Sequence, residues 1–180
     1  MQRHQALIVD GYNVIRNNTR YSQGVDDDFE GGEGWNDARD VLINDAAYYA
    51  QGRFEECTVV FDGAGNPEST GETRSRAGID VIFSATGVSA DSVIERLAHD
   101  ARERGLEVVV VSSDAAVQST VYGGGVTRMS AAAFGIDSER LEQDWRQDAV
   151  QPGPVKNTIA ERIDPKVAEA LERLLHGDRS

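Results

Sequence analysis

The sequence has little of several residue types, and each shortage excludes a class of protein. Cys57 is the only cysteine, which excludes an intramolecular disulfide and a metal cage built of thiolates. No apolar run approaches the roughly 20 residues that a membrane-spanning helix needs. The first residues run straight into a strand-like segment, so we expect no signal peptide. These features predict a protein of the reducing cytoplasm, with Cys57 as a small buried apolar side chain.

Positive charge is also scarce. The chain has 18 lysines and arginines against 31 aspartates and glutamates, which gives a formal net charge of −13. Such a protein repels a phosphate backbone at long range, so passive binding of nucleic acid by the whole surface is excluded. Any function on nucleic acid must then use a local basic patch, a bound metal ion or a partner.

Several catalytic motifs are missing. The three histidines are scattered and form no pattern typical of a catalytic dyad, and no phosphate-binding P-loop is present. Residues 63–68 begin like a dinucleotide fingerprint, but Glu68 stands where its third glycine is required. Tyr12 stands where a phosphatase of the haloacid dehalogenase type has its second aspartate. The sequence therefore favours none of these enzyme classes.

What is present is an alternation of strand-like and helix-like segments. Apolar runs at residues 6–10, 57–62 and 107–114 each end in an aspartate, and 79–83 and 126–129 are shorter candidates. Runs rich in β-branched residues are typical of strands covered on both faces, and so of a parallel sheet. The pattern predicts an α/β fold whose mostly parallel central sheet of four or five strands is flanked by helices.

Helical periodicity lies between these runs. Helices are predicted over 38–49 with Asn36 as N-cap, over 94–101, after Asp114, and after Asp164 near the end. Leu141 and Trp145 also have helical spacing, which fits either packing on the domain or a partner-binding helix. Residues 17–35 and 63–76 are predicted to be loops. The length suits one domain over residues 1–149, with a linker and final helix at 150–180 packed on it.

The strand-end acids are the most informative residues. Ligands of an open parallel sheet bind beyond the carboxyl ends of its strands, which is where Asp10, Asp62 and Asp114 stand. Asp91 and Glu95 lie on one helical face and can add a fourth acid. Converging carboxylates repel, and a divalent cation relieves that repulsion. Oxygen ligands without clustered cysteine or histidine indicate Mg²⁺ or Mn²⁺.

Each acid also has a purely structural explanation. Asp10 and Asp62 each precede a glycine, and such dipeptides are common in turns. Asp114 can cap the next helix, while Ser92 and Glu95 match a capping box. The repetition of strand followed by aspartate favours a site, because three independent turns or caps would need no such pattern.

The order of motifs resembles one known family. The resembling stretches are Leu7 to Ile15, Ala38 to Leu42, Val59 to Gly63, Ser89 to Arg96, Val109 to Asp114 and Gly123 to Ala131. Together they are similar to the YacP-like NYN family, over roughly residues 6–134. This resemblance implies a PIN-like three-layer fold and endoribonuclease activity, in one branch of the family on ribosome-associated messenger RNA. By motif position it implies an acidic site of Asp10, Asp62, Asp91 and Asp114, with Asn13 orienting a carboxylate or a water.

The resulting hypothesis is hydrolytic cleavage of RNA. One or two Mg²⁺ or Mn²⁺ ions would be held by Asp10, Asp91 and Asp114, with Asp62 as a further ligand or neighbour and Glu95 as an additional acid. Arg74, Arg76 and Arg128 would contact the RNA backbone or else be solvated surface charges. Three alternatives stay open: a non-catalytic module that binds the ribosome or an RNA-processing complex, a phosphohydrolase of small nucleotides, and a deoxyribonuclease.

Overall fold

The protein has a mostly parallel sheet at its centre. The computed structural model describes residues 4–25, 32–63, 69–114 and 125–150. Within these ranges the sheet has six strands in the order β3-β4-β2-β1-β5-β6. The strands are β1 (Gln5–Asp10), β2 (Glu56–Phe61), β3 (Thr73–Arg76), β4 (Ile79–Phe83), β5 (Glu107–Val111) and β6 (Val126–Met129). The predicted α/β fold is confirmed, with one strand more than the upper number expected.

The additional strand is β3, which lies within the predicted loop of 63–76. It pairs antiparallel with β4, and Arg74 stands opposite Val81. All four of its residues are exposed. The loop prediction was wrong here because an edge strand of polar residues carries no apolar alternation, so only its hydrogen bonds to β4 reveal it.

The register of the central strands decides where the site lies. β1 pairs in parallel with β2 and with β5, so that Asp10 stands beside Val60 and Val9 beside Val111. The carboxyl ends of these three strands therefore meet at one edge of the sheet. Whatever follows each strand lies at that edge.

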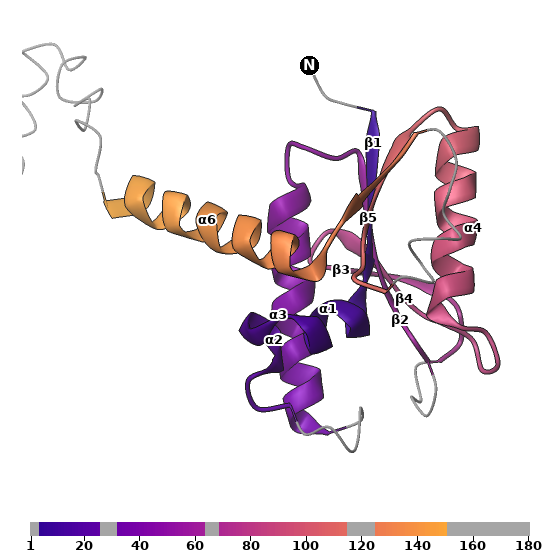
Figure 1. The fold of residues 1–180 in the computed structure, drawn as a ribbon, viewed down its shortest axis with the longest axis horizontal. Helices are drawn as coiled ribbons and strands as arrows, with labels where there is room; N and C mark the ends of the chain where they lie inside the picture. Colours follow the sequence, from indigo (N-terminus) through magenta and orange to yellow (C-terminus); the bar gives the residue numbers. More distant parts are fainter. Residues whose placement is uncertain (1–3, 26–31, 64–68, 115–124, 151–180) are drawn as a thin grey trace, which may run out of the picture. The chain divides into compact units, whose positions relative to one another are not determined.

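Helices cover both faces of the sheet, which makes three layers (Figure 1). The helices α1 (Gly11–Asn17) and α3 (Glu33–Ala50) pack on one face, and α4 (Ala90–Glu103) packs on the other. The remaining described helices are α2 (Thr19–Ser22) and α6 (Ala131–Val150). Apolar side chains recur every three or four residues along α3, as predicted, and give it its buried stripe.

Two predicted boundaries were wrong. α3 begins at Glu33 rather than after Asn36, because the Asn36 side chain accepts a hydrogen bond from the Arg39 guanidinium instead of capping the backbone. The predicted loop of 17–35 contains α2, a single turn that Asn18 caps by accepting from the Arg20 amide at 2.9 Å. One capped turn is too short to show a periodic pattern in sequence.

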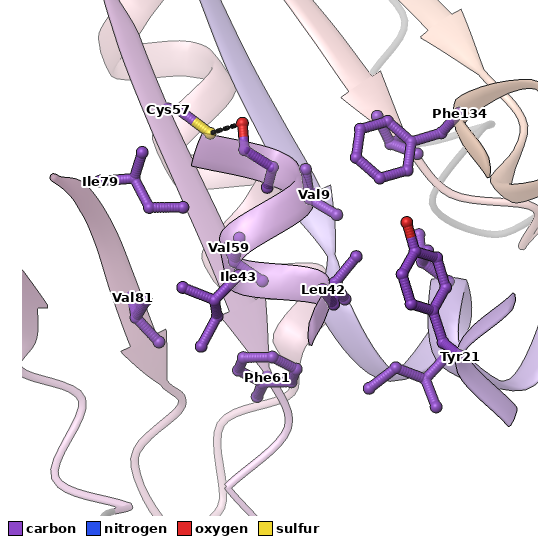
Figure 2. Packing of buried hydrophobic residues seen from close by; sticks show 14 of the residues in the cluster. Val9, Tyr21, Leu42, Ile43, Cys57, Val59, Phe61, Ile79, Val81 and Phe134 are labelled. Carbon is purple, nitrogen blue, oxygen red and sulfur yellow. Dashed lines mark hydrogen bonds between the residues drawn. The ribbon is translucent and has the colours of Figure 1, made fainter. Parts of the chain in front are cut away.

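The larger apolar core lies between the sheet and α3 (Figure 2). Val9, Val59 and Leu42 are fully buried there. Cys57 is buried beside them, and its thiol donates to the Ala46 carbonyl at 3.8 Å. Burial raises the pKa of this thiol to about 12, so it stays protonated. The prediction that Cys57 is a buried apolar side chain is confirmed.

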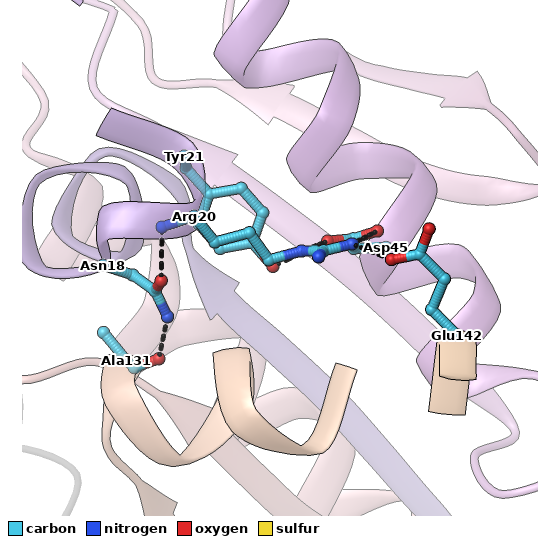
Figure 3. A network of polar contacts seen from close by, with 6 residues as sticks. All are labelled: Asn18, Arg20, Tyr21, Asp45, Ala131 and Glu142. Atoms are coloured by element: carbon cyan, nitrogen blue, oxygen red, sulfur yellow. Dashed lines mark hydrogen bonds and ion pairs between the residues drawn. The ribbon is translucent and has the colours of Figure 1, made fainter. Parts of the chain in front are cut away.

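A polar network connects α2 and α3 with α6 (Figure 3). Arg20 donates two hydrogen bonds to Asp45, at 2.6 and 3.1 Å, and one to Glu142 at 2.9 Å. The Asn18 amide donates to the Ala131 carbonyl at 2.9 Å. α2 and α3 are thus connected with α6 at Ala131 and at Glu142.

The chain divides into two compact units, residues 1–142 and 143–180. The predicted boundary between residues 149 and 150 stays a prediction. The helices predicted after Asp114 and Asp164, and the predicted linker beyond Val150, lie outside the described residues. In the part that is described, no helix is long and apolar enough to cross a lipid bilayer.

Candidate active site

Asp10 is the buried centre of the site. It ends β1 and is the N-cap of α1, where its carboxylate accepts from the Asn13 amide at 3.4 Å. The Ser112 hydroxyl donates to the same carboxylate at 3.0 Å. Only 7% of Asp10 is exposed. Gly11 follows because a side chain there would collide with the Phe61 ring.

Asp62 and Asp91 meet at the start of α4. Asp62 directly follows β2 and accepts from the Ala90 amide at 3.5 Å, and Asp91 is in the first turn of the helix. The cap of α4 is Ser89, which accepts from the Ser92 amide at 3.2 Å. The capping box considered for Ser92 is therefore wrong. The cap stands three residues earlier, which places Asp91 beside Asp62.

Asp114 is held by the loop that follows β5. Its amide donates to the Ser112 hydroxyl at 3.1 Å, so one serine side chain contacts both Asp10 and the Asp114 backbone. The Asn13 side-chain oxygen accepts from the Ser113 amide at 2.7 Å. Asn13 thus ties α1 to the loop that carries Asp114. This contact differs from the predicted one, in which Asn13 orients a carboxylate or water.

The four aspartates line one pocket of about 390 Å³ at the carboxyl edge of the sheet. Its lining residues are Asp10, Tyr12, Asn13, Arg16, Asn17, Asp62, Ala90, Asp91 and Asp114. The structure therefore brings together the four predicted acids and Asn13. Glu95 is exposed on α4 and is not among the lining residues.

The carboxylates influence one another's protonation. Burial raises the pKa of Asp10 from 3.8 to about 6, because the charged form loses its water. Hydrogen bonds from Ser112 and Asn13 oppose this rise, and the charges of Asp91 and Asp114 add to it. Burial also raises the pKa of Asp91, and Asp114 and Asp62 add to that shift. A cation in the pocket would remove this repulsion.

The acids suit a hydrated ion better than a closed cage. Among residues 4–25, 32–63, 69–114 and 125–150, no three carboxylate, imidazole or thiol groups stand close enough to ligate one ion directly. Mg²⁺ keeps several of its waters and usually binds through one or two carboxylates. Acids spread around an open pocket, offering oxygen donors only, fit that mode of binding.

Comparison with known proteins identifies the fold. Residues 7–176 match the YacP-like NYN domain family. The chain belongs to this family. YacP from Bacillus subtilis (strain 168) is 31% identical over 172 residues, which cover 96% of this chain and 97% of YacP. The resemblance found in the sequence is thus confirmed.

Solved structures agree with this family assignment. The crystal structure of Rae1 (YacP) from Bacillus subtilis has a TM-score of 0.66 at 26% identity, covering 96% of this chain and 95% of that one. A mutant of the same protein has a TM-score of 0.64 at 26% identity, over 84% of this chain and 86% of that one. The NYN domain described here therefore has an RNA-related, nuclease-like fold.

The arginines predicted to contact RNA do not line the pocket of this NYN domain. Arg74 and Arg76 are on the edge strand β3, and Arg76 forms an ion pair with Asp40 at 3.3 Å. Arg128 is on β6, in register with Val110 near the carboxyl edge. Since β3 runs antiparallel, Arg76 pairs with Ile79 at the opposite end of β4 from the site. Their RNA contacts stay a prediction.

Two pocket features were missed from the sequence. Arg16 lines the pocket from the last turn of α1, and Ser112 links Asp10 to the Asp114 loop. Arg16 was missed because α1 itself was not predicted: Asp10-Gly11 has the composition of a turn, whereas here it opens a helix. The signal that could have revealed this helix is the preference of aspartate for the N-cap position.

The raised pKa of Asp10 predicts a pH-dependent stability. A carboxyl group whose folded pKa exceeds its unfolded value stabilises the fold less as pH rises through that interval. Relative to Asp10→Asn, the metal-free protein should lose up to about 3 kcal/mol of unfolding free energy between about pH 4 and about pH 6. The pKa of Asp91 is also raised, so this residue changes the stability in the same direction.

The measurement is urea unfolding of both proteins in EDTA from about pH 4 to about pH 8. A stability difference that stays constant over this range would show that Asp10 titrates normally in the folded protein.

Proposed function

We propose that this protein is a metal-dependent endoribonuclease that hydrolyses RNA phosphodiester bonds in the pocket of Asp10, Asp62, Asp91 and Asp114. The observation that carries the proposal is the gathering of four aspartates from separate segments around one pocket at the carboxyl edge of the sheet. Membership of a nuclease-like family supports the reaction class.

The chain's own residues have separate parts in this reaction. Asp10, Asp91 and Asp114 would hold one or two Mg²⁺ or Mn²⁺ ions, partly through the waters of the ion, and Asp62 would be a further ligand or a neighbour. The bound ion supplies a water of lowered pKa and stabilises charge on the phosphate. Ser112 fixes the orientation of Asp10, and Asn13 fixes the loop of Asp114.

The strong negative charge of the chain is compatible with this proposal. A cation bound by the aspartates reduces the local repulsion of a phosphate. Arg128 lies near the carboxyl edge and would contact the RNA backbone beyond the pocket, with Arg74 and Arg76 along the β3 edge. RNA as substrate supports the expectation of an activity in the cytoplasm. Ribosome-associated messenger RNA, the substrate of one branch of the resembling family, is the first physiological form to test.

The test is cleavage of one labelled sequence in four forms: single-stranded RNA, structured RNA, ribosome-bound RNA and the matched DNA. Each is incubated with Mg²⁺, with Mn²⁺ and with EDTA. We expect internal cuts in RNA that need a divalent ion, and intact DNA.

Other outcomes would identify the alternatives. Equal cutting of DNA would indicate a deoxyribonuclease, and turnover of free nucleotides alone a small-molecule phosphohydrolase. Ribosome binding that persists in EDTA without any RNA cleavage would identify a non-catalytic module and overturn the proposal.

A further inference from the structure

Arg16 is a positive charge at an acidic pocket. It lies in the last turn of α1 and is exposed, and among the described residues that line the pocket it is the one basic side chain. Arg16 stands six positions after Asp10, which corresponds to a rise of about 9 Å along the helix axis. Arg16 therefore lies at the other end of α1 from the buried carboxylate that caps this helix.

Two buried aromatic rings orient this guanidinium. Its Cζ atom is 5.5 Å from the centre of the Trp35 ring and 5.9 Å from that of Tyr12. The two rings pack edge to face with centres 5.4 Å apart, and they are 1% and 4% exposed. Such a platform cannot shift without disturbing the core. The two rings hold the otherwise flexible Arg16 side chain in one orientation, so that binding an anion costs little further side-chain entropy.

Arg39 supports the platform from inside the protein. This buried arginine donates to the Tyr12 hydroxyl at 2.8 Å, and its Cζ atom is 5.9 Å from the Tyr12 ring centre. Tyr12 thus contacts two arginines, of which one is buried and the other is exposed at the pocket. The buried arginine thus holds in place the ring beside which Arg16 lies.

The Arg16 guanidinium can bind an anion through its N–H donors. Stacking on a ring uses the face of a guanidinium, whereas its N–H donors lie in the plane and match the oxygens of a phosphate. This geometry suits an anion that enters the pocket from solvent.

We propose that Arg16, oriented by Tyr12 and Trp35, binds a backbone phosphate of the RNA strand in the acidic pocket. The inference rests on the proposed function and adds a substrate-binding residue to it. The carboxylates would hold the cation, and Arg16 would hold the strand beside it. The substrate is thereby bound through its backbone rather than through its bases.

The experiment compares Arg16→Ala and Arg16→Lys with Arg53→Ala. Arg53 is the matched control, because its Cζ atom is 4.7 Å from the centre of the Tyr49 ring and it is absent from the pocket lining. Cleavage of a fluorescein-labelled single-stranded RNA gives kcat and KM. Fluorescence anisotropy of the same RNA on the Asp10→Asn background with Mg²⁺, at several salt concentrations, gives binding without cleavage. Thermal unfolding shows whether each variant is folded.

For Arg16→Ala we expect a KM raised about tenfold with a smaller change in kcat, and a slope of log affinity against log salt reduced by about 0.7. Arg16→Lys should restore the slope but not the full affinity, because an ammonium lacks the planar fork. Arg53→Ala should match the wild type.

Unchanged KM and salt slope in both Arg16 variants, beside an active wild type, would overturn this inference and leave the proposed nuclease intact. A wild type that binds RNA without cleaving it would remove the nuclease, while the salt slope would still decide the part played by Arg16. A wild type that does neither would remove both.

Discussion

Asparagine at position 10 should abolish RNA cleavage, by about a thousandfold or more, and leave the fold intact. Asparagine is as good an N-cap as aspartate, so α1 still begins at Gly11. Its side-chain oxygen can still accept from Ser112, as the carboxylate does at 3.0 Å. What Asp10→Asn removes is the negative charge that would hold the cation.

The measurement is single-turnover cleavage of labelled RNA with saturating Mg²⁺ or Mn²⁺. Asp114→Asn should show a comparable loss. Glu95→Gln is the matched control, because Glu95 is on the same helix as Asp91 but outside the pocket lining, and it should keep its activity within about twofold. Full activity in cleanly purified Asp10→Asn protein would exclude the mechanism.

Alanine at position 61 should cost about 3–5 kcal/mol of unfolding free energy, a large fraction of the stability of a domain this size. Phe61 is completely buried, and its ring centre is 5.1 Å from that of Tyr12 and 5.2 Å from that of Phe83. The ring also packs on Gly11. Removing it opens a cavity beneath the residues that hold Asp10 and Asp62 in place.

Urea unfolding in EDTA gives the free energy, and Phe61→Leu serves as the control. Leucine keeps most of the volume, so we expect a cost below about 1.5 kcal/mol. A loss under about 1 kcal/mol in Phe61→Ala would show that the neighbouring rings close the cavity, and that this packing does not position the site.

The strand ends were predictable because two patterns coincide there. A run such as Leu7 to Val9 is apolar without interruption, and an aspartate follows it. The apolar run predicts a strand covered on both faces, and parallel pairing then fixes the edge at which its last residue lies. The gathering of acids therefore followed from pattern and topology, without any knowledge of distances.

Other features could not be predicted in this way. The strand β3 is polar and exposed, and its antiparallel direction, which carries Arg76 away from the site, depends on a turn at Ala77 and Gly78 that adopts positive φ. The role of Ser112 depends on its hydrogen bond to Asp10, which stands more than a hundred positions earlier in the chain. Such long-range contacts leave no local signal in the sequence.

The edge strand β3 has a further consequence for the behaviour of the protein at high concentration. Its outer side faces no other strand among the described residues, and an open edge of this kind is a template on which a second sheet can grow. Arg74 and Arg76 place two like charges along only four residues. A neighbouring molecule approaching edge to edge would bring the same two arginines against them, which disfavours pairing of two such edges.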